Sequence, residues 1–209
     1  MKKMMKRLQM ILISLLLLFV LGCGLLGGGT REITRFFVLR PLSEPAASAV
    51  APGGSDPLSI GIGPVKLPDS LNRPQMVTRL GENEVRVEPF YRWAAPLSEN
   101  ITAVLVENLS SLLGTNRVVP FPWAVTSRPT YQIRITVVDF MGALGGEATL
   151  EARWVLTEGE APRELVNKRS SFKTPVPSHE HSALVTAQSR LLSDFSREIA
   201  QALSRLGKN

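Results

Sequence analysis

Hydrophobic and polar residues alternate with a period of two along several stretches of the chain, which is the pattern of half-buried strands. The clearest stretch is residues 131–140, where every second residue from Tyr131 to Val137 is apolar. The segment GENE at residues 81–84 supplies a hairpin turn between two shorter stretches. We therefore expect strands at residues 35–40, 58–68, 75–80, 85–90, 131–140, 147–157 and 163–173. Within the second stretch, Gly61 and Gly63 indicate that another backbone approaches closely.

Two further stretches have apolar residues at helical spacing. Residues 97–113 predict a helix with Ser98 as its N-cap and Gly114 as the residue that ends it. Residues 178–206 predict a long amphipathic helix. Its apolar face consists of Leu184, Ala187, Leu191, Phe195, Ile199, Ala202 and Leu206.

The order of elements is strands, helix, strands, helix, with no repeat of fixed period. This order predicts a single α/β or α+β domain, in which a mixed sheet of about five or six strands has two main helices packed on it.

The first 22 residues have the layout of a secretory signal. Four basic residues occur by position 7 with no acidic one, and residues 10–21 are apolar apart from Ser14. An apolar run of about a dozen residues is shorter than the ~20 residues of a membrane-spanning helix. We expect residues 1–22 to direct export.

The only cysteine of the chain, Cys23, follows this signal directly. One thiol cannot form an internal disulfide and supplies too few ligands for a structural zinc site. The segment Val20-Leu21-Gly22-Cys23 resembles the bacterial lipobox, which implies that Cys23 carries a thioether-linked diacylglycerol and an N-acyl chain. Two or three acyl chains anchor a protein stably to a membrane. The alternative is an uncleaved signal anchor with an incidental cysteine.

The residue after the cysteine bears on the choice of membrane. In Gram-negative lipoproteins an aspartate at this position commonly retains the protein at the inner membrane. Here the position is Gly24, which by this rule permits delivery to the outer membrane.

The expected organisation is a signal peptide at 1–22, a lipidated flexible tether at 23–34 and a folded domain at 35–206. A loop rich in Pro, Ala, Ser and Gly interrupts that domain at 41–57.

Charge argues against a nucleic-acid partner. The formal net charge of +6 falls to +2 when residues 1–22 are removed, and basic and acidic residues are interspersed in the remainder. A nucleic-acid-binding domain needs a basic stripe.

The motifs of common enzymes are also absent from the sequence. Residues 61–66 (GIGPVK) begin like a dinucleotide fingerprint, but the third glycine is missing and Pro64 removes an amide. His179 and His181 lack neighbouring metal ligands, and a loop before a helix explains them equally well. We expect no catalytic activity, metal or cofactor beyond the covalent lipid.

Two tripeptides carry a more specific signal. Arg73-Pro74-Gln75 before a strand, and Arg92-Trp93-Ala94 leading into a helix, make the chain similar to the ABC-type transport auxiliary lipoproteins, the PqiC family. The flanking segments 36–39 (FFVL), 61–68 (GIGPVKLP) and 131–140 (YQIRITVVDF) also resemble that family.

The resemblance implies an outer-membrane-anchored, periplasm-facing auxiliary or adaptor subunit. Its partners would be an MCE-domain conduit protein and that protein's inner-membrane or ABC transporter components, moving phospholipids or other hydrophobic molecules. The matching positions Arg73, Pro74, Gln75, Arg92 and Trp93 are candidates for partner contact or for the fold, and core packing is the ordinary role for Trp93. Self-association into a ring is permitted by the sequence.

Two alternatives belong to other classes of protein. A structural or assembly lipoprotein of an unrelated outer-membrane complex would share the anchor and the lack of chemistry. An anchored enzyme would need a convergent polar site, for which His179, His181, Asp139 and Glu147 are the candidates.

Overall fold

The computed structural model describes residues 3–7, 10, 32–42, 59–124, 128–159 and 162–206. The chain divides into two compact units, Met1–Ile33 and Thr34–Asn209. Residues 3–7 in the first unit are helical. All the strands and long helices that follow belong to the second unit.

A mixed five-stranded sheet, here called the large sheet, spans the second unit in the order β5-β2-β6-β7-β8. Its strands are β5 (Val118–Pro120), β2 (Ile60–Lys66), β6 (Tyr131–Asp139), β7 (Glu147–Glu158) and β8 (Arg163–Pro175). Strand β2 is parallel to β5 and β6, whereas β6, β7 and β8 are antiparallel neighbours. Buried and exposed residues alternate along β6, so one face of the sheet lies on the core and the other meets solvent.

A second sheet of three strands, the small sheet, has the order β1-β4-β3. Strands β3 (Gln75–Arg79) and β4 (Val85–Trp93) form the expected antiparallel hairpin, and β1 (Arg35–Phe37) adds in parallel to β4. The predicted α+β class is therefore confirmed. The strands divide between two sheets rather than forming one. The sequence pattern does not predict this division, because alternation indicates which face of a strand is buried but not which strand pairs with it.

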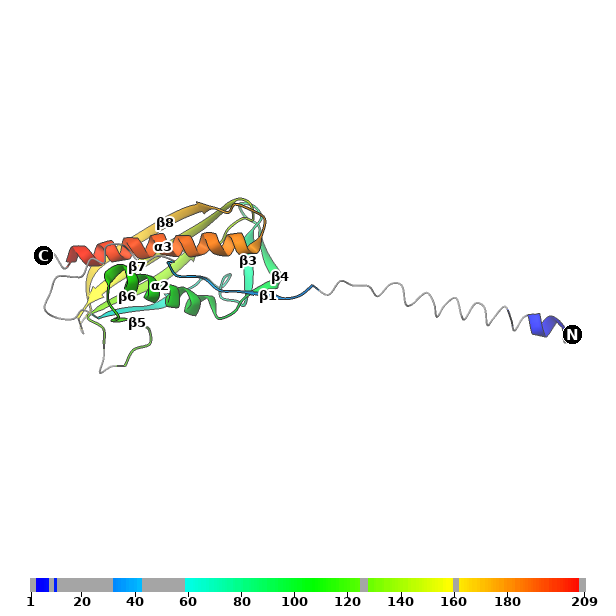
Figure 1. Ribbon diagram of the computed structural model, residues 1–209, viewed down its shortest axis with the longest axis horizontal. Coiled ribbons are helices and arrows are strands. Elements are labelled where there is room, and N and C mark those ends of the chain that lie inside the picture. Colours follow the sequence, from blue (N-terminus) through cyan, green and yellow to red (C-terminus); the bar gives the residue numbers. More distant parts are fainter. Residues whose placement is uncertain are drawn as a thin grey trace. The chain divides into compact units, whose positions relative to one another are not determined.

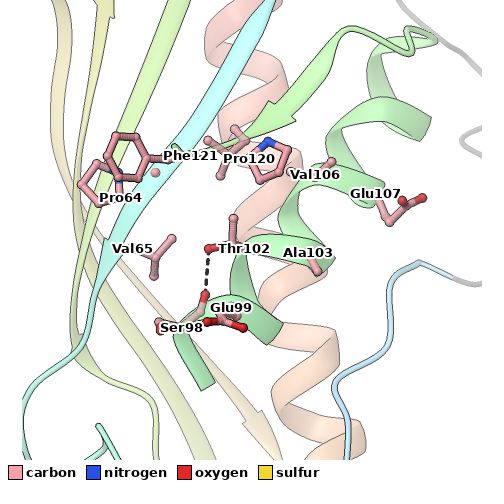
Figure 2. Close-up of a pocket in the computed structure, with 12 residues that line it drawn as sticks. Pro64, Val65, Ser98, Glu99, Thr102, Ala103, Val106, Glu107, Pro120 and Phe121 are labelled. Atoms are coloured by element: carbon pink, nitrogen blue, oxygen red, sulfur yellow. Dashed lines mark hydrogen bonds between the residues drawn. The ribbon is translucent and has the colours of Figure 1, made fainter. Parts of the chain in front are cut away.

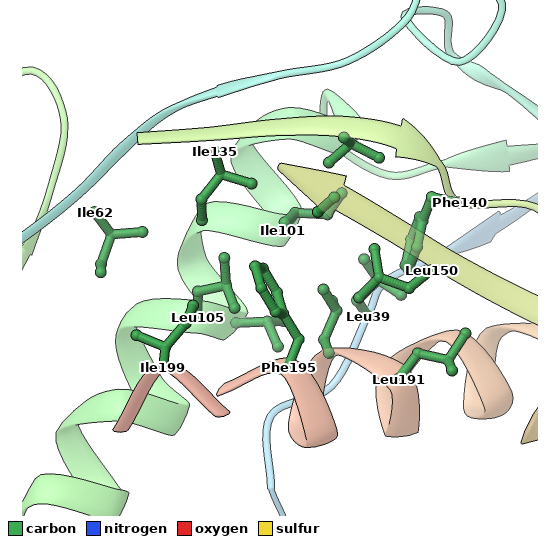
Figure 3. Close-up of a cluster of buried hydrophobic side chains, with 14 of the residues drawn as sticks. Leu39, Ile62, Ile101, Leu105, Ile135, Phe140, Leu150, Leu191, Phe195 and Ile199 are labelled. Carbon is green, nitrogen blue, oxygen red and sulfur yellow. The ribbon is translucent and has the colours of Figure 1, made fainter. Parts of the chain in front are cut away.

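Helices α2 (Leu97–Leu113) and α3 (His181–Leu206) lie side by side on one face of the large sheet (Figure 1). Their apolar faces meet the sheet in a continuous core (Figure 3). Leu105 of α2, Phe195 of α3 and Ile135 of β6 are each no more than 1% exposed. This two-layer arrangement buries the apolar stripe of both helices and a single face of the sheet.

The ends of the elements show where local sequence signals failed. Helix α2 spans the expected 97–113, and Gly114 ends it in the left-handed conformation with φ 61° and ψ 38°. The prediction that Ser98 caps this helix is wrong: the N-cap is Pro96, and no side chain caps the turn. Proline supplies a suitable φ in place of a side-chain acceptor. Helix α3 begins at His181 instead of residue 178, and β5 was not predicted.

Candidate functional site

The two tripeptides come together where the small sheet meets the start of α2. Gln75 of β3 pairs with Arg92 of β4, and the Trp93 N–H donates to the Pro74 carbonyl at 2.8 Å. The next residue, Ala94, donates its N–H to the Phe37 carbonyl at the end of β1 at 2.9 Å. Segments that are far apart in the sequence thus converge on one junction, here called the R-P-Q/R-W-A junction.

A groove of about 350 Å³ opens at this junction, lined by residues 72–74 and 93–97. Trp93 is only 6% exposed and belongs to the hydrophobic core. Arg73 and Pro74 are exposed, whereas Arg92 is half-buried and its Nε has no hydrogen-bond partner within the described residues. At this junction, Trp93 therefore packs in the core, whereas Arg73 and Pro74 are accessible to a partner.

A second groove, of about 500 Å³, lies between α2 and the β2–β5 edge of the large sheet (Figure 2). Pro64, Val65 and Phe121 form an apolar wall opposite the helix. Figure 2 shows Glu99 and Glu107 on the helix side, where Thr102 Oγ1 also donates to the Ser98 carbonyl at 2.7 Å. The groove is thus apolar with two carboxylates on its helix side.

Two glycines of β2 make room for this edge of the sheet. Gly63 has φ 117°, and a Cβ built there would lie 2.9 Å from Phe121 Cβ. A Cβ on Gly61 would lie 2.6 Å from Pro129 Cγ and 2.8 Å from Trp123. The prediction that another backbone approaches these glycines is wrong: the nearest atoms belong to the side chains of Pro129, Trp123 and Phe121.

His181 belongs to a buried polar cluster between α3 and the small sheet. Its ring stacks on Tyr91 with 3.5 Å between centroids and 10° between planes. His181 Nε2 lies 3.5 Å from Glu88 Oε1, which accepts a hydrogen bond from Thr78 Oγ1 at 2.8 Å. These contacts tie the first turn of α3 to strands β3 and β4.

The other candidates for a catalytic site have different partners. Asp139 forms an ion pair with Arg79 at 2.8 Å, Glu147 pairs with Lys173 at 3.1 Å, and the His179 ring lies against Gly145. Burial raises the pKa of Asp139 above its ordinary value, against the opposing effect of the Arg79 guanidinium. None of these residues lines either groove, and the described part of the chain holds no group of three or more His, Cys, Asp or Glu that could bind a metal.

Residues Cys23 and Gly24 lie outside the described residues, so the lipid attachment and the sorting role remain predictions. The helices within the described ranges are all too short or too polar to cross a membrane.

Comparison with known proteins decides the family. The family model of the ABC-type transport auxiliary lipoprotein component matches residues 41–200. The chain belongs to this family. It is 22% identical to the intermembrane transport lipoprotein PqiC of Escherichia coli (strain K12) over 199 residues, which cover 93% of this chain and 97% of that protein. PqiC of Shigella flexneri matches with the same identity and coverage.

Two solved structures share the fold. A crystal structure of an uncharacterized protein superposes with a TM-score of 0.67 at 18% identity, covering 82% of this chain and 99% of the other. A Xanthomonas campestris protein superposes with a TM-score of 0.66 at 16% identity, covering 84% of this chain and 98% of the other. At these identities the likeness shows the fold alone.

Membership in the auxiliary lipoprotein family places the chain among transport-associated lipoproteins and not in an enzyme family. The matched range contains both tripeptides of the R-P-Q/R-W-A junction and the groove of Figure 2. Sequence reasoning found the junction through its motif. It missed the groove, because Pro64 and Phe121 meet only when β5 pairs with β2, and the one local sign was Gly63.

Proposed function

We propose that this auxiliary lipoprotein is anchored to the outer membrane through Cys23 and acts as an adaptor of an MCE-type trans-envelope transport system. The cargo would be phospholipids or other hydrophobic molecules. The observation that carries the proposal is the family match over residues 41–200, on a chain whose start resembles a lipobox. The similarity to PqiC, which is named an intermembrane transport lipoprotein, supports it.

The R-P-Q/R-W-A junction is the surface that we assign to partner contact. Arg73 and Pro74 are exposed beside a groove, and the backbone beneath them is held by the hydrogen bond from Trp93 to Pro74. Arginine is enriched among the residues that contribute most of the binding energy in protein interfaces. Trp93 supports this surface from the core.

The test is a crosslinked pull-down of the lipidated protein from native membranes, followed by identification of the proteins recovered. We expect an MCE-domain protein, with its recovery reduced several-fold by Arg73→Glu. The matched control is Arg134→Glu on the solvent face of β6, which makes the same charge change on an exposed residue.

Failure to recover an MCE-domain protein, with the lipoprotein itself well enriched, would favour an assembly role in another outer-membrane complex. Equal recovery with both variants would keep the adaptor role and remove Arg73 from the contact surface.

A further inference from the structure

A third groove, here called the arginine groove, runs between α3 and the segment that follows β1. Its volume is about 520 Å³, and its walls come from residues 37–42 and from the exposed side of α3 between Ser182 and Arg197. This volume lies within the ~300–1,000 Å³ typical of small-molecule sites. It shares no residue with the junction groove or the groove of Figure 2.

Backbone hydrogen bonds to side chains of α2 and α3 hold the wall opposite α3 in place. The Arg40 N–H donates to Ser189 Oγ at 3.0 Å, and the Leu42 N–H donates to Asn108 Oδ1 at 2.7 Å. Leu39, directly before Arg40, inserts into the core and is 4% exposed (Figure 3). The shape of the groove is therefore set before any ligand enters, which lowers the entropic cost of binding.

The charged side chains that line the arginine groove are mostly basic. Arg40, Arg190 and Arg197 line it together with one acid, Asp194. Asp194 is already paired with Arg197 at 2.8 Å, and neither Arg40 nor Arg190 forms an ion pair with any of the described residues. The groove thus carries a net charge of +2 from its side chains, equal to that of the whole chain after residue 22.

Apolar side chains adjoin these guanidinium groups. Phe37 and Val38 form part of the wall, Val38 is 51% exposed, and Val185 of α3 lies across from them. A ligand that satisfies both parts of the groove has an anionic group next to apolar surface. Arginine binds phosphate oxygens in a bidentate manner, so a phosphate diester joined to a hydrocarbon fits this combination.

The length of the chain before the groove favours a ligand in the membrane. Phe37 lies 14 positions after Cys23, the proposed site of lipid attachment. A fully extended chain spans about 3.3–3.6 Å per residue, so the groove stays within roughly 50 Å of the anchored lipid. Phospholipid headgroups are therefore present at high local concentration.

We propose that the arginine groove binds the phosphate of a phospholipid headgroup, with Arg40 and Arg190 as its main donors and the Phe37–Val38 wall against the adjoining glycerol and methylenes. The inference deepens the proposed function, on which it rests for the membrane anchor.

The experiment uses the full-length protein in living cells grown with ³²P-phosphate. The photoreactive residue p-benzoylphenylalanine replaces Thr186, which is exposed in the arginine groove, or Ala103, which is exposed in the groove of Figure 2. The diacylglycerol on the anchor contains no phosphate, so it adds no label. We expect a ³²P-labelled adduct at position 186 at least fivefold above that at 103. Its label should be lost on treatment with phospholipase C, if the crosslink is to the glycerol or an acyl chain, or with phospholipase D, if it is to the headgroup.

The arginines are tested on the background of the probe at position 186. Arg40→Gln with Arg190→Gln should lower the labelled adduct at least fivefold. Arg134→Gln with Arg153→Gln removes the same charge from exposed residues of β6 and β7 and should leave it unchanged. Arg190→Gln alone replaces the double variant in this test if the latter misfolds. The Arg190 side chain is exposed and forms no hydrogen bond with the described residues.

Equal labelling at positions 186 and 103, or labelling that survives loss of the arginines, would overturn the inference. Label that resists both phospholipase C and phospholipase D would identify another phosphorylated lipid, and an adduct with a protein would identify an acidic partner. Either outcome would refute the phospholipid assignment. The pull-down separates this inference from the proposed function. If the MCE partner is recovered but no phospholipid adduct forms, only the assignment of phospholipid binding to the arginine groove is refuted.

Discussion

Asp139 shows how one carboxyl group makes stability depend on pH. The Arg79 guanidinium donates to Asp139 Oδ2 at 2.8 Å, yet burial dominates and raises the pKa of Asp139. A raised pKa means that the folded protein binds the proton more tightly than the unfolded chain. The contribution of this group to the free energy of unfolding is therefore greatest below its unfolded pKa and decreases as pH rises through the folded pKa.

The variant Asp139→Asn removes this titration. We expect the free energy of unfolding of the wild type, minus that of the variant, to increase as pH falls from 7 towards 4. Urea unfolding of both proteins at several pH values, followed by circular dichroism, measures this difference. A difference that stays constant would show that burial and the ion pair with Arg79 cancel, and one that decreases towards acid pH would show that the ion pair outweighs burial; either contradicts the raised pKa.

At the scale of elements, Asn108 joins three parts of the molecule. It is fully buried on α2, its Nδ2 donates to Ser196 Oγ of α3 at 3.1 Å, and its Oδ1 accepts from the Leu42 N–H. The side chain therefore connects both helices to the segment that forms one wall of the arginine groove. A buried amide in this position is valuable because the Leu42 N–H would otherwise lack an acceptor. Ser196 Oγ would lose the Asn108 donor but keep its own hydrogen bond to the Leu192 carbonyl.

Asn108→Ala should lower the free energy of unfolding by about 1–3 kcal/mol, since it removes a fully buried side chain and leaves the part-buried N–H of Leu42 without an acceptor. Chemical denaturation of the purified protein measures this loss. The neighbouring Glu107→Ala, at an exposed position of the same helix, should change stability by less than about 0.5 kcal/mol. Similar losses in the two variants would contradict the role of Asn108 as a connection between elements.

At the scale of the whole molecule, the proposed function depends on the predicted lipid anchor at Cys23. Cys23→Ser should abolish incorporation of labelled fatty acid and leave an unprocessed precursor, because no thiol remains to form the thioether. Label that persists in Cys23→Ser would disprove lipidation at this residue.

Gly24→Asp should move the protein from outer-membrane to inner-membrane fractions of a density gradient. Gly28→Asp, which adds the same charge farther along the chain, should not.

Much of the architecture was accessible from local patterns. The bounds of α2, the β3–β4 hairpin and the long strands β6 to β8 follow from periodicity, because alternate or helical spacing records which face of an element is buried. The family was also recognised from short motifs around Arg73 and Trp93, and the family model then confirmed it.

The class of fold, most of the elements and the family could be predicted from the sequence, as could the anchor at Cys23, since each depends on residues close together in the chain. Tertiary structure alone decided that the strands form two sheets and that residues 38–42 lie against α3. It also brought Arg40 within one groove with Arg190, at a separation of 150 residues in the sequence. The physical reason is that strand pairing and groove formation depend on contacts between distant segments, and local periodicity carries no record of which segments will meet.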